Sequence, residues 1–391
     1  MSQTEVVQEK DFDLLVLILR GRIFHRGHET IVEAALAKAH NVLMLVGSDN
    51  VSRCHDGNEF IAEEAVSMIR AVYPENGAGA RVSVRTIGDV MHDEADLFWL
   101  MGVQRAVFDE KKAIARWRGT EDEQGKLRIG LIGFSKDRTS YYLKKFPQWR
   151  SVNVEGYRHQ GRIVSATDIR NEFFYGDKFG TAALPAIRNR VSEPVARWLF
   201  DWAMDNHSTI EWLRNESGFC VNYKVEHEFL GRVDPETGAR KPKPYTANHS
   251  TTDAIVIQSG HVLLIRRRKN PGLGKWALPG GFLDPNERTR DGVIRELREE
   301  TKLQMAANVL RLAFRHKVVF SDPYRSKRGR IITHAYLYLL NDRTTLPLVD
   351  PNGGDDADRA EWVPLGEVDP LTMYEDHYHI LMKTLHLLPV D

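Results

Sequence analysis

The sequence has little cysteine, no excess of either charge and no long hydrophobic run. Its 391 residues include two cysteines, which lie far apart and supply neither a disulfide framework nor a zinc-binding spacing. The 54 Lys and Arg residues balance the 54 Asp and Glu residues, so no overall field favours nucleic acid or an anionic membrane. The purely aliphatic run Leu14–Leu19 is far too short to span a bilayer, and the polar residues before it do not resemble a signal peptide.

These absences predict a cytoplasmic protein in a reducing compartment, with no membrane partner and no nucleic-acid partner. They leave the oligomeric state open, a homo-oligomer included. The length suits two or three domains, and 42% hydrophobic residues suffice for buried cores.

Strand-like and helix-like segments alternate in the first half of the chain. Apolar runs typical of buried strands occupy residues 14–19, 42–46, 82–86 and 128–132, and helices are expected at 29–40, 62–73 and 96–117. This alternation predicts an α/β fold with a doubly wound, Rossmann-like parallel sheet. Ligands of such sheets bind beyond the carboxyl ends of the strands.

The second half has a different pattern. Residues 185–230 favour helices, and residues 231–248 are rich in Gly, Pro and charge, which is typical of a linker. A hairpin is expected at 254–257 and 262–265, a second strand pair at 309–320 and 331–340, and a last helix near 377–387. We therefore expect a domain at 11–185, a helical extension and linker at 186–250, and an α+β sandwich at 251–391.

The stretch from Gly281 to Leu303 carries a cluster of carboxylates. Its segment from Thr289 to Thr301 predicts a helix that places Glu296, Glu299 and Glu300 on one face within a single turn. Like charges so close repel one another, whereas a hard divalent cation would be held by such oxygen ligands together with substrate phosphates. A solvated, charge-rich helix is the alternative interpretation.

The spacing within this stretch closely resembles the Nudix box. The fixed positions that match are Gly281, Glu287, Arg295, Glu296, Leu297, Glu299 and Glu300. The resemblance implies that Glu296, Glu299 and Glu300 bind Mg²⁺, with Mn²⁺ as the alternative, and that Gly281, Glu287 and Arg295 support them. The box has a Gly where this chain has Lys302, at the expected end of the helix.

A histidine pair follows the first strand. His25 and His28 flank Gly27 at the mouth of the first expected helix, whose N-terminal N–H groups favour phosphate. Each imidazole can donate to a phosphate oxygen, and either could be cationic near neutral pH. A packed histidine pair at a helix cap is the alternative.

A second polar group opens a later helix. Ser165, Thr167 and Arg170 supply two hydroxyls and a guanidinium, which suit a polyphosphate. Taken alone, a plain N-cap with an exposed arginine is the favoured interpretation of these residues.

Together, these two groups resemble the nucleotidyltransferase superfamily, and residues 133–149 look like the nicotinamide mononucleotide (NMN) adenylyltransferases fused to a C-terminal Nudix domain. The resemblance covers nearly the whole chain. It implies catalytic roles for His25, His28, Arg170, Glu299 and Glu300, and substrate binding by Arg20 or Arg22, Gly27, Trp99, Lys136, Asp137, Ser165 and Thr167.

Three departures accompany the resemblance. The arginine before the first motif histidine is matched only by a shift of register, so Arg20 and Arg22 are both candidates. Asn58-Glu59-Phe60 stands where the family often has Asn-Pro-Phe, and Leu97 replaces an Asn two residues before Trp99. These departures bear on the acceptor more than on adenylyl transfer.

The resemblance implies two reactions: adenylyl transfer from ATP to NMN, giving NAD and pyrophosphate, and metal-dependent hydrolysis of ADP-ribose to AMP and ribose 5-phosphate. The general base of the hydrolysis stays open. The alternative function is an active Nudix hydrolase whose N-terminal domain senses nucleotide or adenylylates another acceptor. A basic loop, Tyr324–Arg330, could contact a substrate phosphate, but a solvated hairpin tip is the favoured interpretation.

Overall fold

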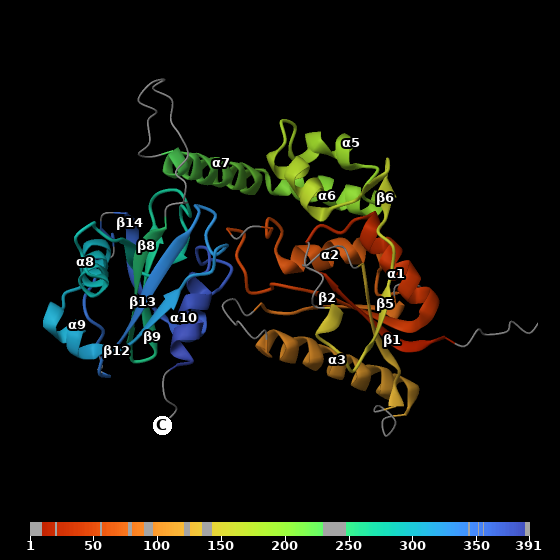
Figure 1. The fold of residues 1–391 in the computed structure, drawn as a ribbon, viewed down its shortest axis with the longest axis horizontal. Coiled ribbons are helices and arrows are strands. Elements are labelled where there is room, and N and C mark those ends of the chain that lie inside the picture. The colour runs from red at the N-terminus through yellow and green to blue at the C-terminus, as the bar shows by residue number, and fades with distance from the viewer. Residues whose placement is uncertain are drawn as a thin grey trace, which may run out of the picture. The chain divides into compact units, whose positions relative to one another are not determined.

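The computed structural model describes residues 10–19, 22–54, 57–76, 80–89, 97–120, 126–134, 143–229, 248–342, 345–350, 352–354 and 356–387. The chain forms two compact units (Figure 1). Unit 1 comprises residues 1–50 and 57–211, and unit 2 comprises residues 51–56 and 212–391. Within the described ranges, no helix is long and apolar enough to cross a membrane.

Unit 1 is built on a parallel sheet with the strand order β3-β2-β1-β4-β5. Its strands are β1 (Phe12–Leu19), β2 (Ala39–Val46), β3 (Val82–Thr86), β4 (Ile129–Gly133) and β5 (Arg150–Asn153). All eight residues of β1 are buried, because this strand lies in the middle of the sheet with helices over both faces. The predicted doubly wound α/β fold is confirmed.

The helices of unit 1 divide between the two faces of this sheet. Figure 1 shows α1 (Arg26–Lys38) and α2 (Ala62–Val72) on one side and α3 (Leu97–Arg118) on the other. The strand order reverses between β1 and β4, so a crevice is expected outside the carboxyl ends of these two strands. The chain that leaves β1 leads directly to the histidine pair, and this places the pair at the sheet's ligand-binding edge.

A short hairpin and a series of helices follow β5. The hairpin pairs β6 (Arg158–His159) with β7 (Arg162–Ile163). It leads into α4 (Ala166–Arg170), a π-helical turn (Asn171–Tyr175) and a 3₁₀ turn (Gly180–Ala183). Three further helices follow in order: the short α5 (Leu184–Ile187), then α6 (Glu193–Asp205) and α7 (His207–Phe229). The helical character expected for residues 185–230 is thus observed through Phe229.

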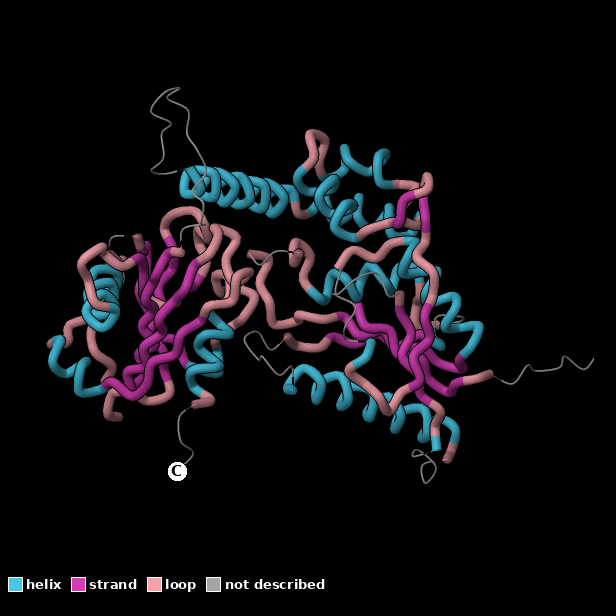
Figure 2. The backbone as a smooth tube through the Cα atoms, in the orientation of Figure 1, coloured by secondary structure: helices cyan, strands magenta, loops and turns pink. Residues whose placement is uncertain are grey.

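Unit 2 is a sheet of seven strands between helices. The central path runs β10-β9-β8-β13-β12, with β11 paired to β8 and β14 paired to β9. Its strands are β8 (His249–Gln258), β9 (His261–Arg267), β10 (Trp276–Ala277), β11 (Gly280–Phe282), β12 (Phe314–Phe320), β13 (Ile331–Leu339) and β14 (Ala357–Pro364). Figure 2 shows the sheet edge-on, with α8 (Thr289–Thr301) and α9 (Ala307–Ala313) on one face and α10 (His377–Leu385) on the other. A short 3₁₀ turn, Leu365–Glu367, follows β14.

One predicted strand is wrong at its start. Residues 309–313 belong to helix α9, and the strand begins only at Phe314. Leu310 and Ala313, three residues apart, are buried, whereas Val309 and Leu312 are exposed. This spacing is that of one helix face, which a short apolar run does not distinguish from a strand.

Candidate functional site

The histidine pair caps helix α1. His25 is the N-cap residue, and its Nδ1 accepts a hydrogen bond from the backbone N–H of Gly27 at 3.0 Å. A Cβ atom at position 27 would lie 2.8 Å from Cε1 of His25, so only glycine leaves room for this ring. Gly27 therefore leaves room for the ring of His25, whereas the resemblance implies substrate binding by this residue.

The two imidazole rings stack on each other. Their centroids lie 3.9 Å apart, and the ring of Phe24 stacks on the far side of His28 at 5.6 Å. Burial lowers the pKa of His28 to about 4, so this side chain is uncharged near pH 7, contrary to the cationic alternative. Among the described residues, its buried Nδ1 has no hydrogen-bond partner. A ligand could therefore supply the missing partner of His28.

The β6–β7 hairpin brings the second polar group toward this pair. Tyr157 lies next to Gly27, because a Cβ atom built on Gly27 would be 3.7 Å from the Cβ atom of Tyr157. The carbonyl of Tyr157 accepts a hydrogen bond from the N–H of Val164 at 3.0 Å. Ser165 follows as the N-cap of α4, but its hydroxyl makes no capping hydrogen bond. Instead, Ser165 lines a cavity of about 690 Å³ together with Asp168. Thr167 lies in the first turn of α4, exposed to solvent.

Arg170 does not extend into solvent. It is 8% exposed, and its Nε lies 2.9 Å from Oε2 of Glu59, which is 2% exposed. The other carboxylate oxygen of Glu59 accepts a hydrogen bond from the Tyr175 hydroxyl at 3.1 Å. The exposed arginine of the N-cap interpretation is therefore wrong. Glu59 is a neighbour of this site that the sequence marked only as a departure.

The remaining candidates of unit 1 differ in their surroundings. Arg22 is 1% exposed and donates to the carbonyl oxygens of Phe60, at 2.8 Å, and of Ser48. These contacts stabilise the loops after β1 and β2 rather than leaving the guanidinium open to a ligand. Trp99 is partly buried on α3 and packs against Phe146, with ring centroids 6.0 Å apart. The other three candidates, Arg20, Lys136 and Asp137, lie outside the described residues.

In unit 2, the carboxylate helix spans the predicted residues. Helix α8 runs from Thr289 to Thr301 and buries Val293 and Leu297 against the sheet. Gly281 lies beside it, because a Cβ atom there would come within 2.7 Å of the carboxylate of Glu296. The helix therefore positions its acidic face against strand β11.

Arg295 connects the acidic groups of this face. Its Nη1 donates to Glu296 and to Glu299, each at 2.9 Å, and its Nε and Nη2 hold Glu287 at 2.9 and 2.8 Å. These bonds, those with Glu287 above all, raise the pKa of the guanidinium and lower the pKa of the Glu287 carboxyl. The positive charge of Arg295 thus offsets the repulsion among the carboxylates that it contacts.

Glu300 has a different environment. It is 4% exposed, and one carboxylate oxygen accepts a hydrogen bond from the N–H of Gly280 at 2.8 Å. Burial raises its pKa well above the usual range, and the nearby Glu296 acts in the same direction. A divalent cation would reverse both effects. No group of three His, Cys, Asp or Glu side chains in the described ranges already has the arrangement of a metal cage. The donor types and the buried carboxylate nevertheless fit a hard cation.

Lys302 ends the helix in a left-handed conformation. Its φ is +51° and its ψ is 31°, and its N–H donates to the carbonyl of Arg298 at 3.0 Å. Glycine is the usual residue at such a position, which explains why the box has glycine there. The departure therefore affects the helix end rather than the carboxylate face.

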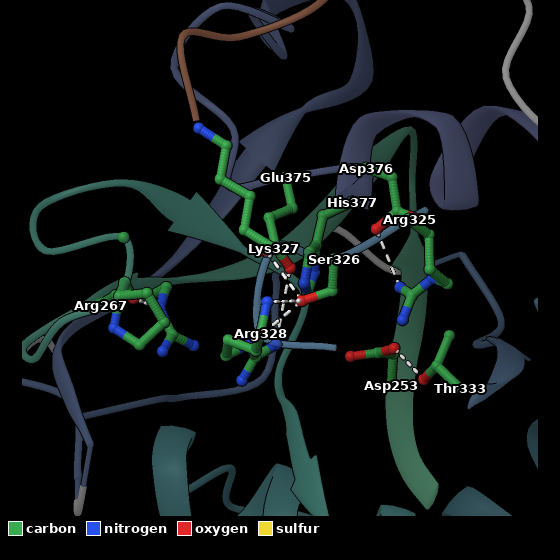
Figure 3. Close-up of polar contacts among 12 residues, drawn as sticks. Asp253, Arg267, Arg325, Ser326, Lys327, Arg328, Thr333, Glu375, Asp376 and His377 are labelled. Atoms are coloured by element: carbon green, nitrogen blue, oxygen red, sulfur yellow. Dashed lines mark hydrogen bonds and ion pairs between the residues drawn. The ribbon is translucent and has the colours of Figure 1, made fainter. Parts of the chain in front are cut away.

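The basic loop is not a solvated tip throughout. Arg325 and Ser326 are buried, so the favoured interpretation is wrong for them, although Tyr324 is exposed. Figure 3 shows Arg325 in a two-pronged ion pair with Asp376, with both bonds at 2.8 Å, and Ser326 donating to Glu375 at 2.9 Å. These contacts attach the loop to the segment before α10.

The attached loop directs Arg328 toward the box. Its guanidinium carbon lies 5.8 Å from the ring centre of Phe282 and 5.7 Å from that of Tyr374, and Arg267 lies over the same Tyr374 ring at 4.5 Å. The guanidinium groups of Arg267 and Arg328 therefore both lie over the ring of Tyr374. The basic composition of the loop pointed to Arg328, but no local pattern pointed to Arg267.

Comparisons with known proteins cover both units. The family model described as the NUDIX domain matches residues 247–384. A nicotinamide/nicotinic acid mononucleotide adenylyltransferase of Acinetobacter baylyi is 34% identical over 174 residues, which are 44% of this chain and 81% of that protein. An ADP-ribose pyrophosphatase of Methanocaldococcus jannaschii is 28% identical over 171 residues, 42% of this chain and 92% of that protein.

Two crystal structures resemble nearly the whole chain. Both are of a bifunctional NMN adenylyltransferase/ADP-ribose pyrophosphatase from Francisella tularensis, one of them in complex with AMP and a manganese ion. Each is 26% identical and covers 96% of this chain and 99% of its own chain, with TM-scores of 0.75 and 0.72.

A parallel, doubly wound unit with a histidine pair after its first strand, followed by a Nudix unit, defines a nucleotidyltransferase fused to a Nudix hydrolase. The similarity spans both units in one chain and in the same order. This chain belongs to the family of bifunctional NMN adenylyltransferase/Nudix hydrolases.

Proposed function

We propose that the chain is a bifunctional enzyme of NAD metabolism. Unit 1 transfers the adenylyl group of ATP to NMN, giving NAD and pyrophosphate, and unit 2 hydrolyses ADP-ribose to AMP and ribose 5-phosphate. The observation that carries this proposal is the similarity to the Francisella tularensis enzyme over 96% of this chain and 99% of the other. The separate similarities to an adenylyltransferase and to an ADP-ribose pyrophosphatase support one reaction each.

In unit 1, the acceptor phosphate attacks the α-phosphorus of ATP and pyrophosphate leaves. Such transfers depend mostly on positioning and charge stabilisation, so no protein nucleophile is required. His25 and His28 bind the ATP phosphates; Gly27 keeps the ring of His25 in place, and the buried Nδ1 of His28 gains its missing partner. Ser165, Thr167 and Arg170 hold the departing pyrophosphate.

The acceptor contacts of unit 1 follow from the resemblance. Trp99 offers the part of its ring that Phe146 leaves uncovered to the pyridine ring of the acceptor. Lys136 and Asp137 complete the substrate-binding set. Arg20 is the better candidate for the family's arginine, since Arg22 is engaged by two backbone carbonyls.

In unit 2, Glu296, Glu299 and Glu300 would hold a divalent cation, Mg²⁺ or Mn²⁺; a manganese ion accompanies AMP in one Francisella tularensis structure. Such a cation neutralises the diphosphate and lowers the pKa of an attacking water. Arg295 orients two of these carboxylates, and Glu287 orients Arg295. Arg328 and Arg267 present positive charge beside the box, where the substrate phosphates would lie.

Product analysis of the intact protein tests both halves. One reaction contains Mg²⁺, ATP and either NMN or its nicotinic acid counterpart, and the other contains Mg²⁺ and ADP-ribose. A dinucleotide with pyrophosphate in the first and AMP in the second are the expected products. AMP without dinucleotide would refute transfer to these acceptors, and the reverse result would refute hydrolysis of ADP-ribose.

A further inference from the structure

Glu59 is a buried carboxylate beside Arg170 that has no role in the adenylyl transfer proposed for unit 1. It lies in the loop between β2 and α2, and it is 2% exposed. Its Oε2 faces the Nε of Arg170 at 2.9 Å, and its Oε1 accepts the hydroxyl of Tyr175 at 3.1 Å. A carboxylate this deeply buried needs such partners, because desolvation of an unpaired charge is costly.

The neighbourhood of Glu59 fixes its position. The adjacent Phe60 packs against Phe174 at 5.0 Å and Trp202 at 4.7 Å between ring centroids, and its carbonyl accepts a bond from Arg22 at 2.8 Å. Phe174 and Tyr175 belong to the π-helical turn that continues α4, the helix that bears Arg170. The loop of Glu59 and the helix of Arg170 are therefore packed together around these aromatic rings.

The nearest atoms of the ion pair are Nε of Arg170 and Oε2 of Glu59, and the pair is a charge contact without the geometry of a hydrogen bond. Among the described residues, neither terminal nitrogen of Arg170 makes a hydrogen bond. A guanidinium held at Nε keeps both terminal nitrogens available for a phosphate, which accepts such paired donors. Gly57, with a φ of +84°, lies beside Nη2, since a Cβ atom there would come within 3.5 Å of it.

We propose that Glu59 is a positioning residue for adenylyl transfer, which orients Arg170 so that its terminal nitrogens meet the departing pyrophosphate. This inference rests on the function proposed above for unit 1. The opposite role is that Glu59 merely competes with phosphate for Arg170. Positioning predicts a lower kcat without Glu59, because the contact with pyrophosphate strengthens as the bond to the α-phosphorus breaks. Competition predicts a lower KM for ATP and no loss of kcat.

The test is a cycle of variants in the full-length chain: Glu59→Ala, Arg170→Ala and the double variant. We expect Glu59→Ala to lower kcat for transfer about 10- to 100-fold with KM for ATP changed less than about threefold, the range found for residues that orient a binding group. In the Arg170→Ala background, Glu59→Ala should lower kcat less than about twofold, because the effects of substitutions at groups that act as a unit are not additive. An equal loss in both backgrounds would overturn the inference, as would a lower KM with an undiminished kcat.

Controls separate positioning from folding. ADP-ribose hydrolysis by the same preparation reports the integrity of the chain. Glu110→Gln removes a matched buried carboxylate of unit 1, which binds Arg85 and Ser83, and should leave transfer unchanged. Tyr175→Phe, a milder change that retains the ion pair, should lower kcat about two- to fivefold. If Tyr175→Phe retained the parent kcat, the orientation of Glu59 by the Tyr175 hydroxyl would have no effect on transfer, which contradicts the proposal.

Binding of inorganic pyrophosphate gives a second readout that does not require turnover. In calorimetric titrations, Glu59→Ala should weaken pyrophosphate binding at least about fivefold, and only when Arg170 is present. Tighter binding would establish competition and refute positioning. If the parent protein forms no dinucleotide, the proposed transfer fails, but this titration still decides the relation between Glu59 and Arg170.

Discussion

The two sites of this chain are constructed in different ways. In unit 2, the candidate metal ligands and the arginine that orients them lie on one helix, α8, within six consecutive residues from Arg295 to Glu300. In unit 1, the phosphate-binding candidates come from α1 and α4, and a third segment supplies Glu59. A site on one helix depends on that helix and its immediate neighbours, here Gly280 and Glu287, whereas a site from three segments depends on how the whole unit packs.

The comparison leads to a difference in how each site should fail. A substitution in α8 should remove hydrolysis and leave transfer unchanged. A substitution in unit 1 should do the reverse, and its effect should spread to residues that only position others. The following experiments test this difference, in order of decreasing effect.

Glu299→Gln should have the largest effect. It removes one negative charge from the face that Arg295 organises, and several kcal/mol of charge stabilisation would depend on the divalent cation that this face is proposed to hold. ADP-ribose hydrolysis should fall about 10³-fold with Mg²⁺ present, while NAD formation stays at the parent rate. Product quantification for both reactions in one preparation measures this.

Glu361→Gln is the matched control for this variant, because Glu361 lies on β14 and pairs with Arg359 away from the box. It should retain both activities. Hydrolysis at the parent rate by the Glu299→Gln protein would remove α8 from the catalytic site.

His28→Ala should come next. It deletes one of the two stacked rings that are proposed to bind the ATP phosphates, and the loss of a single donor to developing charge typically costs about 10²- to 10³-fold. NAD formation should fall by this factor, whereas ADP-ribose hydrolysis should not change. Steady-state rates of both reactions provide the measurement.

His207→Ala serves as its control, since His207 is an exposed histidine of unit 1 that pairs with Glu211 on its own helix and stacks on Phe179. Transfer that survives His28→Ala would show that the ring pair is a packed helix cap, the alternative interpretation of the sequence.

The sequence predicted the two sites to different degrees for the same structural reason. The bounds of α8 were predicted correctly because its determinants, Val293, Leu297 and the carboxylates, are local. The contact between Glu59 and Arg170 could not be predicted, because it depends on the aromatic packing that joins their segments. The error at residues 309–313 is of another kind. A short apolar run fits both the helical and the strand periodicity, and only the burial of its side chains distinguishes the two.

The third experiment concerns pH and tests the burial of His28. Its pKa is lowered to about 4 in the folded chain, below the ordinary value near 6.5, so the unfolded chain binds a proton that the folded chain does not. This contribution to stability is therefore fully present above pH 6.5 and is lost as the pH falls toward 4. At pH 5 the loss should be roughly 2 kcal/mol, at about 1.4 kcal/mol for each pH unit.

Urea denaturation of the parent and of His28→Asn at pH 7.5, 6.5 and 5.0 isolates this contribution. His334 and His377 also have lowered pKa values because of burial, and they give both proteins the same background slope. His25, which faces His28 across the stacked rings, is present in both. Parallel pH profiles for the two proteins would mean that His28 is not buried as a neutral ring.

The smallest effect is expected at Lys302, and it sharpens the view that α8 is a self-contained site. A residue other than glycine with a φ of +51° destabilises the folded chain by about 1 kcal/mol. Glycine removes this strain, but it also gives the unfolded chain more conformational freedom, which offsets part of the gain in stability. Lys302→Gly should therefore raise the free energy of unfolding by up to about 1 kcal/mol, whereas Lys302→Ala retains the strained conformation and should not. Calorimetric unfolding of the full chain compares the two.

Because Lys302 lies beyond the carboxylates, hydrolysis should be the same in both variants. A change in hydrolysis without a change in stability would mean that the end of the helix, and not only its acidic face, belongs to the site.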